Sequence, residues 1–254
     1  MIYAVLNQKG GVGKSTITVN LAYGLSQAGK RTLLVDLDPQ AHSSITYCPE
    51  IPKELTTKEI FTDRSLDPYQ LIRPAVVNGE SMPRLFIIPS NIRLAITAEQ
   101  ITVRTHREKL LYNHLKRIVK DFDAILIDCP PNLGVLTINA IYAAEYIIIP
   151  TIYGKYSLDG IADLFSSIAE VKETESFQYR ILRNAFDARN KQTNQFIENQ
   201  LEPFSTNLLK TIIRKTEAIN QAQINNEPVF TFDPKGNGTQ DFTALTQEIL
   251  MSHG

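Results

Sequence analysis

Short runs of apolar residues alternate along the chain with longer stretches whose apolar residues recur every three or four positions. The short runs predict buried strands at 2–6, 31–36, 84–88, 124–128, 146–149 and 179–182. The longer stretches predict helices at 18–28, 91–101, 105–119, 133–144, 157–171, 190–202 and 239–251. Because strands and helices alternate, we expect an α/β fold, a doubly wound and mostly parallel sheet with helices on both faces.

Six prolines interrupt the segment 49–90, so we expect less regular structure there, up to the strand at 84–88. The 254 residues are 43% hydrophobic and 21% charged, which describes a globular chain with a sizeable core rather than a disordered one. Since α/β folds of more than ~200 residues commonly form one unit, we expect a single domain over 1–254.

No apolar run approaches the ~20 residues that a membrane-spanning helix needs. The first residues already belong to a predicted strand, so we expect neither a signal peptide nor an additional N-terminal domain, and a cytoplasmic protein without a membrane partner. The two cysteines, Cys48 and Cys129, lie far apart in the sequence. Their spacing fits no metal-binding cluster, and a disulfide is not expected in this compartment.

A glycine-rich loop, Lys9–Thr16 (KGGVGKST), lies between the first predicted strand and the first predicted helix. Glycine permits close approach of a ligand, and the N–H groups of such a loop line an anion site at the helix N-terminus. We expect Lys14 to reach the β- and γ-phosphates of a nucleotide and the Ser15 hydroxyl to bind Mg²⁺, as in a P-loop NTPase. The expected nucleotide-binding residues of the loop are Gly10, Gly11, Val12, Gly13, Lys14, Ser15 and Thr16.

One position of this loop departs from the general P-loop pattern, because Gln8 stands where the pattern has glycine. A glycine-rich turn before a helix is the alternative interpretation of the loop. Lys9 is a second lysine, in addition to the ordinary phosphate lysine Lys14. Its presence decides which class of nucleotide-binding enzyme has to be considered.

Three aspartates follow predicted strands that end at the same edge of the sheet as the glycine loop. Asp128 ends the run Ala124–Asp128 and is the candidate acid for Mg²⁺, with a helix N-cap as the alternative. Asp38 is the candidate to orient an attacking water, and Asp36 the candidate to support the metal shell. Either of these two could instead cap the turn at Pro39.

Charge is nearly balanced over the whole chain, with a net charge of −1, but it is distributed unevenly. The segment 179–215 contains seven basic and three acidic residues. The overall balance argues against a uniformly basic nucleic-acid-binding protein. A locally basic face and a solvated surface of mixed charge both remain open for this segment.

Several motifs together resemble the ParA/Soj partition ATPases, within the deviant Walker A group that includes MinD. They are the loop with the early lysine, VDLDPQ at 35–40, IPSN at 88–91 and ILIDCPPNLGVLTINA at 125–140. The resemblance continues through IIPTIYGKYSLDGI at 148–161, FDAR at 186–189 and FDPKGNG at 232–238. It therefore covers nearly the whole chain, and DPQ after the second strand favours ParA/Soj over MinD.

The resemblance implies a homodimer that holds two ATP–Mg²⁺ molecules between its subunits. Lys9 would reach across to the phosphates of the partner, a position in which a cation stabilises the transferred γ-phosphoryl group. Asp38 corresponds to the hydrolytic aspartate of the family. Asn184 falls where related ATPases contact adenine.

The resemblance also implies contact with double-stranded DNA through its phosphates, without base reading, and a ParB/Spo0J-like partner that stimulates ATP hydrolysis on the nucleoid. Such DNA binding weakens steeply with salt. The candidate DNA-binding residues are Arg189, Lys191, Lys210, Arg214 and Lys215. The segment 212–229 departs from close relatives, since Arg214-Lys215 opens it and Ala218 occupies the place of a later arginine.

Two other functions are compatible with the loop and are disfavoured by other residues. A membrane-cycling, division-site ATPase like MinD needs a basic amphipathic C-terminal helix, but residues 242–254 contain no lysine or arginine. A relative of the nitrogenase iron protein needs two suitably placed cysteines for its cluster, and Cys48 lies far from Cys129. Positioning of another cargo along the nucleoid would use the same machinery as DNA partition.

Overall fold

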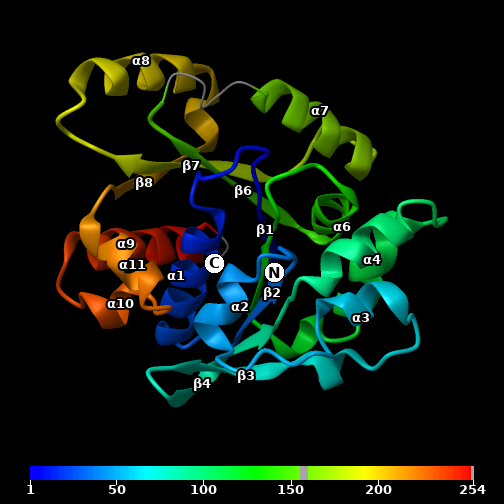
Figure 1. Ribbon diagram of the computed structural model, residues 1–254. Helices are drawn as coiled ribbons and strands as arrows, with labels where there is room; N and C mark the ends of the chain where they lie inside the picture. The colour runs from blue at the N-terminus through cyan, green and yellow to red at the C-terminus, as the bar shows by residue number, and fades with distance from the viewer. Residues whose placement is uncertain (155–159, 253–254) are drawn as a thin grey trace.

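The computed structural model describes residues 1–154 and 160–252 (Figure 1). Within these ranges one sheet of eight strands has the order β3–β4–β2–β5–β1–β6–β7–β8. All neighbouring strands are parallel except β3 and β4, which pair antiparallel. This confirms the predicted α/β fold. The strands are β1 (Ile2–Val5), β2 (Thr32–Asp36), β3 (Arg73–Val77), β4 (Glu80–Ile88), β5 (Ala124–Asp128), β6 (Tyr146–Ile152), β7 (Tyr179–Phe186) and β8 (Leu208–Arg214).

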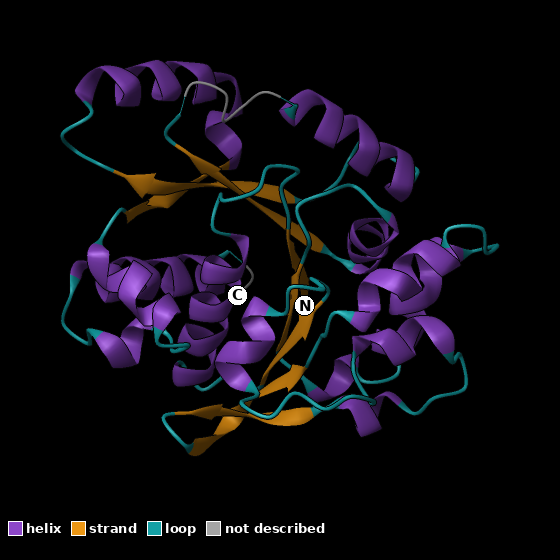
Figure 2. Cartoon of the chain, in the orientation of Figure 1, coloured by secondary structure: helices purple, strands orange, loops and turns teal. Residues whose placement is uncertain are grey.

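Helices cover both faces of the sheet, as Figure 2 shows. One face is packed by α3 (Thr57–Thr62), α4 (Arg93–Ile101), α5 (Leu110–Leu115), α6 (Val135–Ala143), α7 (Ile161–Lys172) and α8 (Lys191–Leu201). The other face is packed by α1 (Lys14–Gln27), α2 (His42–Tyr47), α9 (Glu217–Ile224), α10 (Val229–Phe232) and α11 (Asn237–Met251). Short 3₁₀ turns lie at Pro68–Leu71, Arg107–Lys109, Val119–Asp121 and Glu202–Asn207.

The central strands are apolar on both sides because both of their faces are covered. In β1, Ile2 and Ala4 face the α3–α8 layer, while Tyr3 and Val5 face the other layer. Alternate side chains of a strand point to opposite faces, so a nearly continuous apolar run supplies two cores at once. The strands at the centre of the sheet are therefore the ones that the sequence pattern predicts most directly.

Both edges of the sheet differ from the sequence-based prediction. The strand β3 is absent from that prediction because Pro74 interrupts it, yet proline is tolerated at a sheet edge, where β3 lies. The other edge strand, β8, was not predicted either. The predicted helix 105–119 was also wrong in extent, since a 3₁₀ turn, the short helix α5 and a second 3₁₀ turn occupy residues 107–121. The start of the predicted helix 157–171 lies partly outside the described residues.

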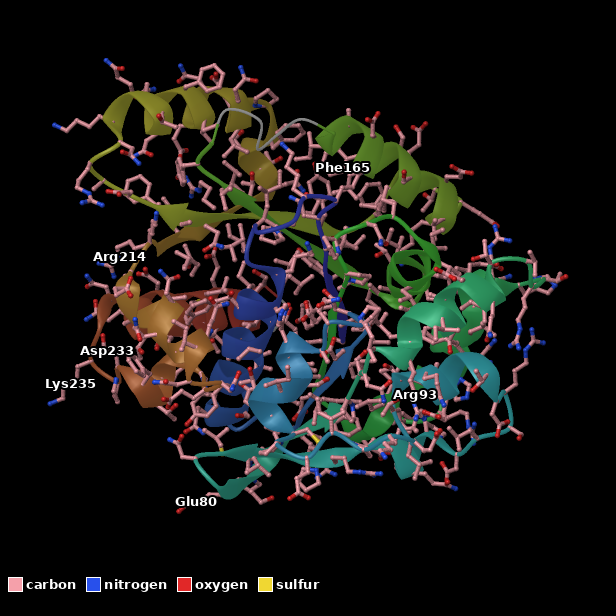
Figure 3. The ribbon with its side chains drawn as sticks, viewed as in Figure 1. Glu80, Arg93, Phe165, Arg214, Asp233 and Lys235 are labelled. Carbon is pink, nitrogen blue, oxygen red and sulfur yellow. The ribbon has the colours of Figure 1, made fainter. Side chains whose placement is uncertain are left out.

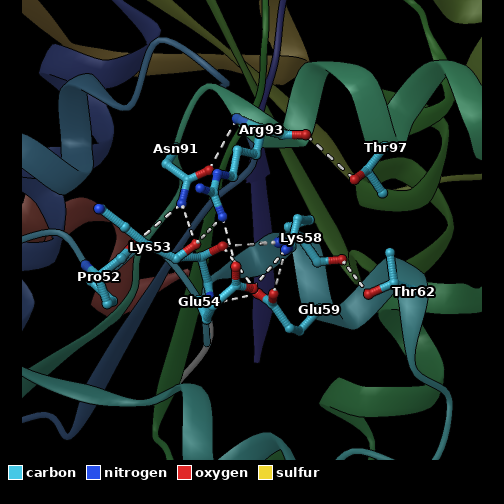
Figure 4. Close-up of polar contacts among 10 residues, drawn as sticks. Pro52, Lys53, Glu54, Lys58, Glu59, Thr62, Asn91, Arg93 and Thr97 are labelled. Atoms are coloured by element: carbon cyan, nitrogen blue, oxygen red, sulfur yellow. Dashed lines mark hydrogen bonds and ion pairs between the residues drawn. The ribbon is translucent and has the colours of Figure 1, made fainter.

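The proline-rich segment before β3 is ordered by side-chain contacts rather than by apolar periodicity. A capping box begins α3, in which Thr56 and Glu59 satisfy each other's backbone N–H groups. Figure 4 shows that the carboxylate of Glu54 forms ion pairs with the ammonium group of Lys58 at 2.8 Å and with the guanidinium group of Arg93 at 2.6 Å. These polar contacts tie the segment to the start of α4.

In the part of the chain that the structure describes, none of the helices has the length and apolar character that a membrane span requires.

Candidate nucleotide-binding site

The glycine loop connects β1 to α1, as expected, and ends where α1 begins at Lys14. Gly11 and Gly13 have φ angles of 72° and 88°, in the left-handed region that favours glycine. A Cβ atom on Gly13 would lie 2.4 Å from Nδ2 of Asn184, so the loop has no room for a side chain there. The backbone is therefore held in the shape that an anion-binding loop requires.

Lys14 lies inside this loop, with 7% of its surface exposed. Its Nζ donates a hydrogen bond to the backbone carbonyl of Lys9 at 2.9 Å. Burial lowers the pKa of Lys14, whereas the neighbouring Asp128 acts in the opposite direction. The ammonium group thus lies beside the loop backbone and faces the acids of the neighbouring strand ends.

Asp36 and Asp128 occupy paired positions at the ends of β2 and β5, and both are fully buried. Ser43 donates to Oδ2 of Asp128 at 2.6 Å, while Oδ1 has no hydrogen-bond partner within 1–154 and 160–252. Burial raises the pKa of Asp128 to about 6. A buried carboxylate oxygen without a partner is costly, so this oxygen is poised to accept a cation or a donor.

Asp36 has a different environment, because both of its carboxylate oxygens are occupied. Oδ1 accepts the backbone N–H of Asp38 at 2.9 Å. Oδ2 accepts both the backbone N–H and the hydroxyl of Ser44, at 2.9 Å and 2.6 Å. Burial and the nearby Asp128 raise the pKa of Asp36 well above its usual value. Asp36 therefore anchors the turn that carries Asp38, and its expected support of the metal shell stays a prediction.

The residues at this edge fit a magnesium ion in their chemistry. Mg²⁺ prefers oxygen ligands, keeps several waters and is commonly held by one or two carboxylates together with phosphate oxygens. The hydroxyl of Ser15 and the free Oδ1 of Asp128 supply such oxygens. Among the described residues, no group of three or more His, Cys, Asp or Glu side chains could hold a metal ion.

A cavity of about 470 Å³ opens over the glycine loop. Asp38 lies on its wall with 8% of its surface exposed, and its Oδ1 accepts the backbone N–H of Gln40 at 2.9 Å. The cavity is bounded by the loop, by α2 and by the turn between α9 and α10. Asp38 is thus the one candidate acid of the three that borders this space, since Asp36 and Asp128 lie behind it.

The wall opposite the loop comes from residues that sequence reasoning missed. Gln223 of α9 donates from its amide to the hydroxyl of Thr16. The side chain of Asn20 donates to the carbonyl of Thr16 and accepts the backbone N–H of Val229, so it connects α1 to α10. No local motif marks Gln223 or Asn20, whereas the pair of hydroxyls after DPQ, Ser43 and Ser44, was a signal that could have been used.

Asn184, which was expected to contact adenine, contacts the glycine loop and does not line the cavity. Its Nδ2 donates to the backbone carbonyl of Val12 at 2.8 Å, and it is not among the residues that border the cavity. Its amide therefore braces the loop from the end of β7. The adenine contact remains a prediction.

The backbone of Lys9 is fixed by a hydrogen bond, whereas its ammonium group has no partner among the described residues. Its N–H donates to Oδ1 of Asn7 at 3.0 Å, and Asn7 in turn donates to the carbonyl of Pro150. The Nζ atom is buried, yet it has no hydrogen-bond partner among the residues that the structure describes. An ammonium group without a partner beside a phosphate-binding loop is consistent with an anionic partner supplied from elsewhere.

Comparison with known proteins agrees with this site. A family model described as an AAA domain matches residues 1–181. The sporulation initiation inhibitor protein Soj of Bacillus subtilis is 32% identical to this chain over 251 residues, which are 98% of this chain and 97% of Soj. The chain belongs to the ParA/Soj family of partition ATPases.

Two further similarities place this ParA/Soj chain among its relatives. The cell division protein PomZ of Myxococcus xanthus is 31% identical over 248 residues, 96% of this chain and 76% of PomZ. A crystal structure of cobyrinic acid a,c-diamide synthase from Mycobacterium smegmatis, with a bound ATP analogue and magnesium, superposes with a TM-score of 0.81. It is 26% identical, and the match covers 98% of this chain and 93% of that one.

The basic residues proposed for DNA contact in this ParA/Soj chain have unequal surroundings. Lys191, Lys210 and Lys215 are exposed. Arg189 pairs with Asp187 at 2.7 Å, in a contact formed within one turn. Arg214, labelled in Figure 3 where the end of β8 meets the α9–α11 group, pairs with the buried Asp241 of α11 at 2.7 Å and also donates its backbone N–H to it. The charge of Arg214 is thus used to hold two elements together.

Proposed function

We propose that the chain is an ATPase that segregates DNA, acting as an ATP-dependent homodimer on nonspecific double-stranded DNA of the nucleoid. A ParB/Spo0J-like centromere-binding protein would stimulate its hydrolysis of ATP. The observation that carries the proposal is the arrangement of Lys14 and Asp38 on the wall of one cavity at the glycine loop, with Asp128 buried behind it. Membership in the ParA/Soj family and the nucleotide-bound relative from Mycobacterium smegmatis support it.

Each residue of the site has a role in this proposal. The loop N–H groups and Lys14 bind the phosphates, for which Nζ of Lys14 gives up its bond to the Lys9 carbonyl. Ser15 and Oδ1 of Asp128 would hold Mg²⁺, which supplies charge neutralisation when bound. The carboxylate of Asp38, fixed from behind by Asp36, orients the attacking water and accepts its proton.

Lys9 connects catalysis to assembly in this proposal. A charged group that arrives from a partner during phosphoryl transfer can raise the rate by ~10³–10⁵. Nζ of Lys9 has no partner among the described residues of the single chain, so the phosphates bound in a second copy of the loop would provide the anion that it lacks. Hydrolysis and dimerisation would then depend on the same ion, and residues 1–254 would act as one ATPase unit.

The test is a salt-titrated binding assay on nonspecific duplex DNA, with ATP, with ADP and without nucleotide. The proposal expects binding that needs ATP and that weakens steeply as salt rises, because each neutralised phosphate releases counterions. Binding independent of nucleotide would contradict it. The oligomeric state in the same three conditions is measured by light scattering, and a dimer is expected with ATP alone.

Positioning of a division site or of another cargo is the second candidate, favoured by the similarity to PomZ. Both functions would use the same ATP site and DNA binding, so they are separated in the cell, by deletion of the gene. Loss of a chromosome or plasmid from daughter cells supports segregation, while faithful inheritance with misplaced division supports positioning.

A further inference from the structure

The arginines of the segment 179–215 carry less free charge than their number suggests. Arg183 pairs with Glu198 at 3.1 Å, Arg189 with Asp187 and Arg214 with Asp241, both at 2.7 Å. Planar guanidinium groups suit such carboxylate contacts. Each of the three acids offsets one positive charge locally, so these three arginines attract a polyanion only weakly. The lysines of the segment and Arg180, whose guanidinium lies over the ring of Tyr146, have no acidic partner among the described residues.

A second basic segment, 107–120, has the opposite character. It contains five basic residues and one acidic residue. Arg107, Lys116, Arg117 and Lys120 are exposed, and none forms an ion pair with the residues that the structure describes. Glu108 approaches only Lys109, at the 4.0 Å limit of an ion pair, and His106. Four of the five cations of this segment are therefore not neutralised by an acid of the described residues, and Lys109 is only weakly paired.

Two lysines and two tyrosines of this region adjoin one another at the junction of α5 and α6. The rings of Tyr112 and Tyr142 meet edge to face, with centroids 5.6 Å apart. Nζ of Lys109 lies 5.5 Å from the centroid of Tyr142, and Nζ of Lys116 lies 5.7 Å from that of Tyr112. We refer to these four residues as the lysine–tyrosine patch. A ring face orients an ammonium group and leaves its charge intact.

The patch is accessible and polar at its surface. Tyr112 is 40% exposed, as is the side chain of Lys109. The hydroxyls of both tyrosines lack hydrogen-bond partners within the described part of the chain. Lys116 also contacts Asn113 at 2.9 Å, a neutral group that leaves its charge uncompensated. The patch thus offers two ammonium groups and two free hydroxyls.

This chemistry matches the phosphates of a nucleic acid better than it matches an acidic protein or a lipid surface. Lysine binds phosphate as a point charge, and tyrosine hydroxyls are common phosphate donors in protein–DNA contacts. Carboxylate recognition favours the arginine fork, which the patch lacks. Insertion into lipid needs large apolar side chains on the same face, and the patch contains none.

We propose that the lysine–tyrosine patch is a second contact surface for the phosphate backbone of double-stranded DNA, separate from the segment 179–215. This inference rests on the proposed function, since it assigns a further surface to the same DNA. Figure 1 shows α8 at the upper left and α4 and α6 on the right side of the molecule. A subunit with both surfaces contacts two stretches of backbone and can bridge them.

The test compares two double variants at equal net charge, each in the full chain with ATP and Mg²⁺. Lys109→Gln with Lys116→Gln removes the patch cations, and Lys30→Gln with Lys235→Gln removes two exposed lysines elsewhere. Affinity for nonspecific duplex is measured over a range of salt. Loss of two phosphate contacts lowers the slope of log affinity against log salt by ~1.8 and weakens binding about tenfold or more near 0.1 M salt. The control pair is expected to leave the slope unchanged.

A second variant keeps the rings and removes one hydroxyl. Tyr112→Phe is expected to weaken DNA binding by roughly three- to tenfold through the lost donor, with unchanged ATP hydrolysis. Unchanged hydrolysis in the lysine variant likewise shows that it folds and binds nucleotide.

The outcomes separate the two proposals. A slope that equals that of the unmodified chain, with ATP-dependent DNA binding intact, overturns the patch and leaves the proposed function standing. An equal fall of the slope in the control variant also overturns the patch, because such a fall shows that the loss of any two positive charges weakens DNA binding at long range. Loss of binding to vesicles of anionic lipid, with DNA binding unaffected, assigns the patch to lipid and refutes the inference. No ATP-dependent binding in the unmodified chain refutes both.

Discussion

Charged side chains occur in two contrasting environments in this molecule. At the carboxyl edge of the sheet, Lys14, Asp36 and Asp128 are buried within hydrogen-bonding distance of fixed partners. At the lysine–tyrosine patch, the charges stand in water beside aromatic rings. Electrostatic interactions strengthen as water is excluded and are screened by salt where water is present. We therefore expect substitutions in the first region to have large effects on binding and catalysis that depend little on salt. Substitutions in the second region should have small effects that depend on salt.

The largest effect is expected at Lys14. Lys14→Ala removes a buried cation that faces Asp128, and truncation of such a partner costs about 2–5 kcal/mol or more in binding. ATP binding and ATP-dependent dimerisation should both be lost, as measured by calorimetry and gel filtration. Lys30→Ala, at an exposed position, is the matched control. Nucleotide-dependent dimers of the Lys14 variant would refute the phosphate role.

Lys9→Ala tests the contrast further, because Nζ of Lys9 is buried yet has no hydrogen-bond partner among the described residues. Nucleotide binding to one subunit should persist, while partner-stimulated hydrolysis falls by ~10³–10⁵, the range of a charge supplied in trans. Single-turnover hydrolysis with and without the stimulating partner measures it. A variant that is stimulated normally would remove Lys9 from catalysis.

Asp38→Ala should separate binding from chemistry. The chain is expected to bind ATP and to accumulate as a dimer, with hydrolysis lowered by ~10²–10⁴, the usual contribution of a general base. Rates and dimer fraction are measured on the same sample. Asp36→Asn is a useful companion, because it disturbs the anchor of Asp38 and should lower hydrolysis without removing the reacting carboxylate. Normal turnover in Asp38→Ala would overturn the assignment.

Asp128 makes the stability of the nucleotide-free chain depend on pH. Its pKa rises from 3.8 to about 6 on folding, so the folded state binds a proton more tightly than the unfolded state. The unfolding free energy therefore decreases as pH rises from about 4 to about 6, by on the order of 3 kcal/mol. Urea unfolding measures the difference in unfolding free energy between pH roughly 4.5 and roughly 7, near the two ends of this pH range. Asp128→Asn should reduce it, with the remainder due to Asp36, and an undiminished difference would contradict this account.

The smallest effect is expected at Arg189, on the exposed side of the comparison. Its side chain is 87% exposed, and its guanidinium is already paired with Asp187. Arg189→Gln should remove at most one phosphate contact, which lowers the salt slope of DNA binding by no more than ~0.9 and leaves ATP hydrolysis unchanged. Arg214→Gln is the contrasting variant, because it breaks the pair with buried Asp241 and should destabilise the fold more than it weakens DNA binding. An unchanged slope for Arg189→Gln would remove it from the DNA surface.

The prediction from sequence was best where burial imposes a strong pattern. Apolar runs such as Ala124–Asp128 lie in central strands covered on both faces, so their composition alone indicates their place. Edge elements escaped because β3 carries a proline and β8 packs against neighbours on fewer sides. The segment 105–119 looked like one helix, yet His106 adopts a positive φ of 57° there and the helix proper starts only at Leu110.

For the site, the sequence by itself determined the glycine loop, its two lysines and the strand-end acids, because phosphate binding demands these residue types at close spacing. Only the tertiary structure separated Asp36 from Asp128, since their different partners, Ser44 and Ser43, come from another element. It alone brought Gln223 to Thr16 and placed Lys109 against Tyr142. Chemistry that is local in the chain is encoded by spacing, whereas the partner that satisfies or frees a charge is decided by packing between distant segments.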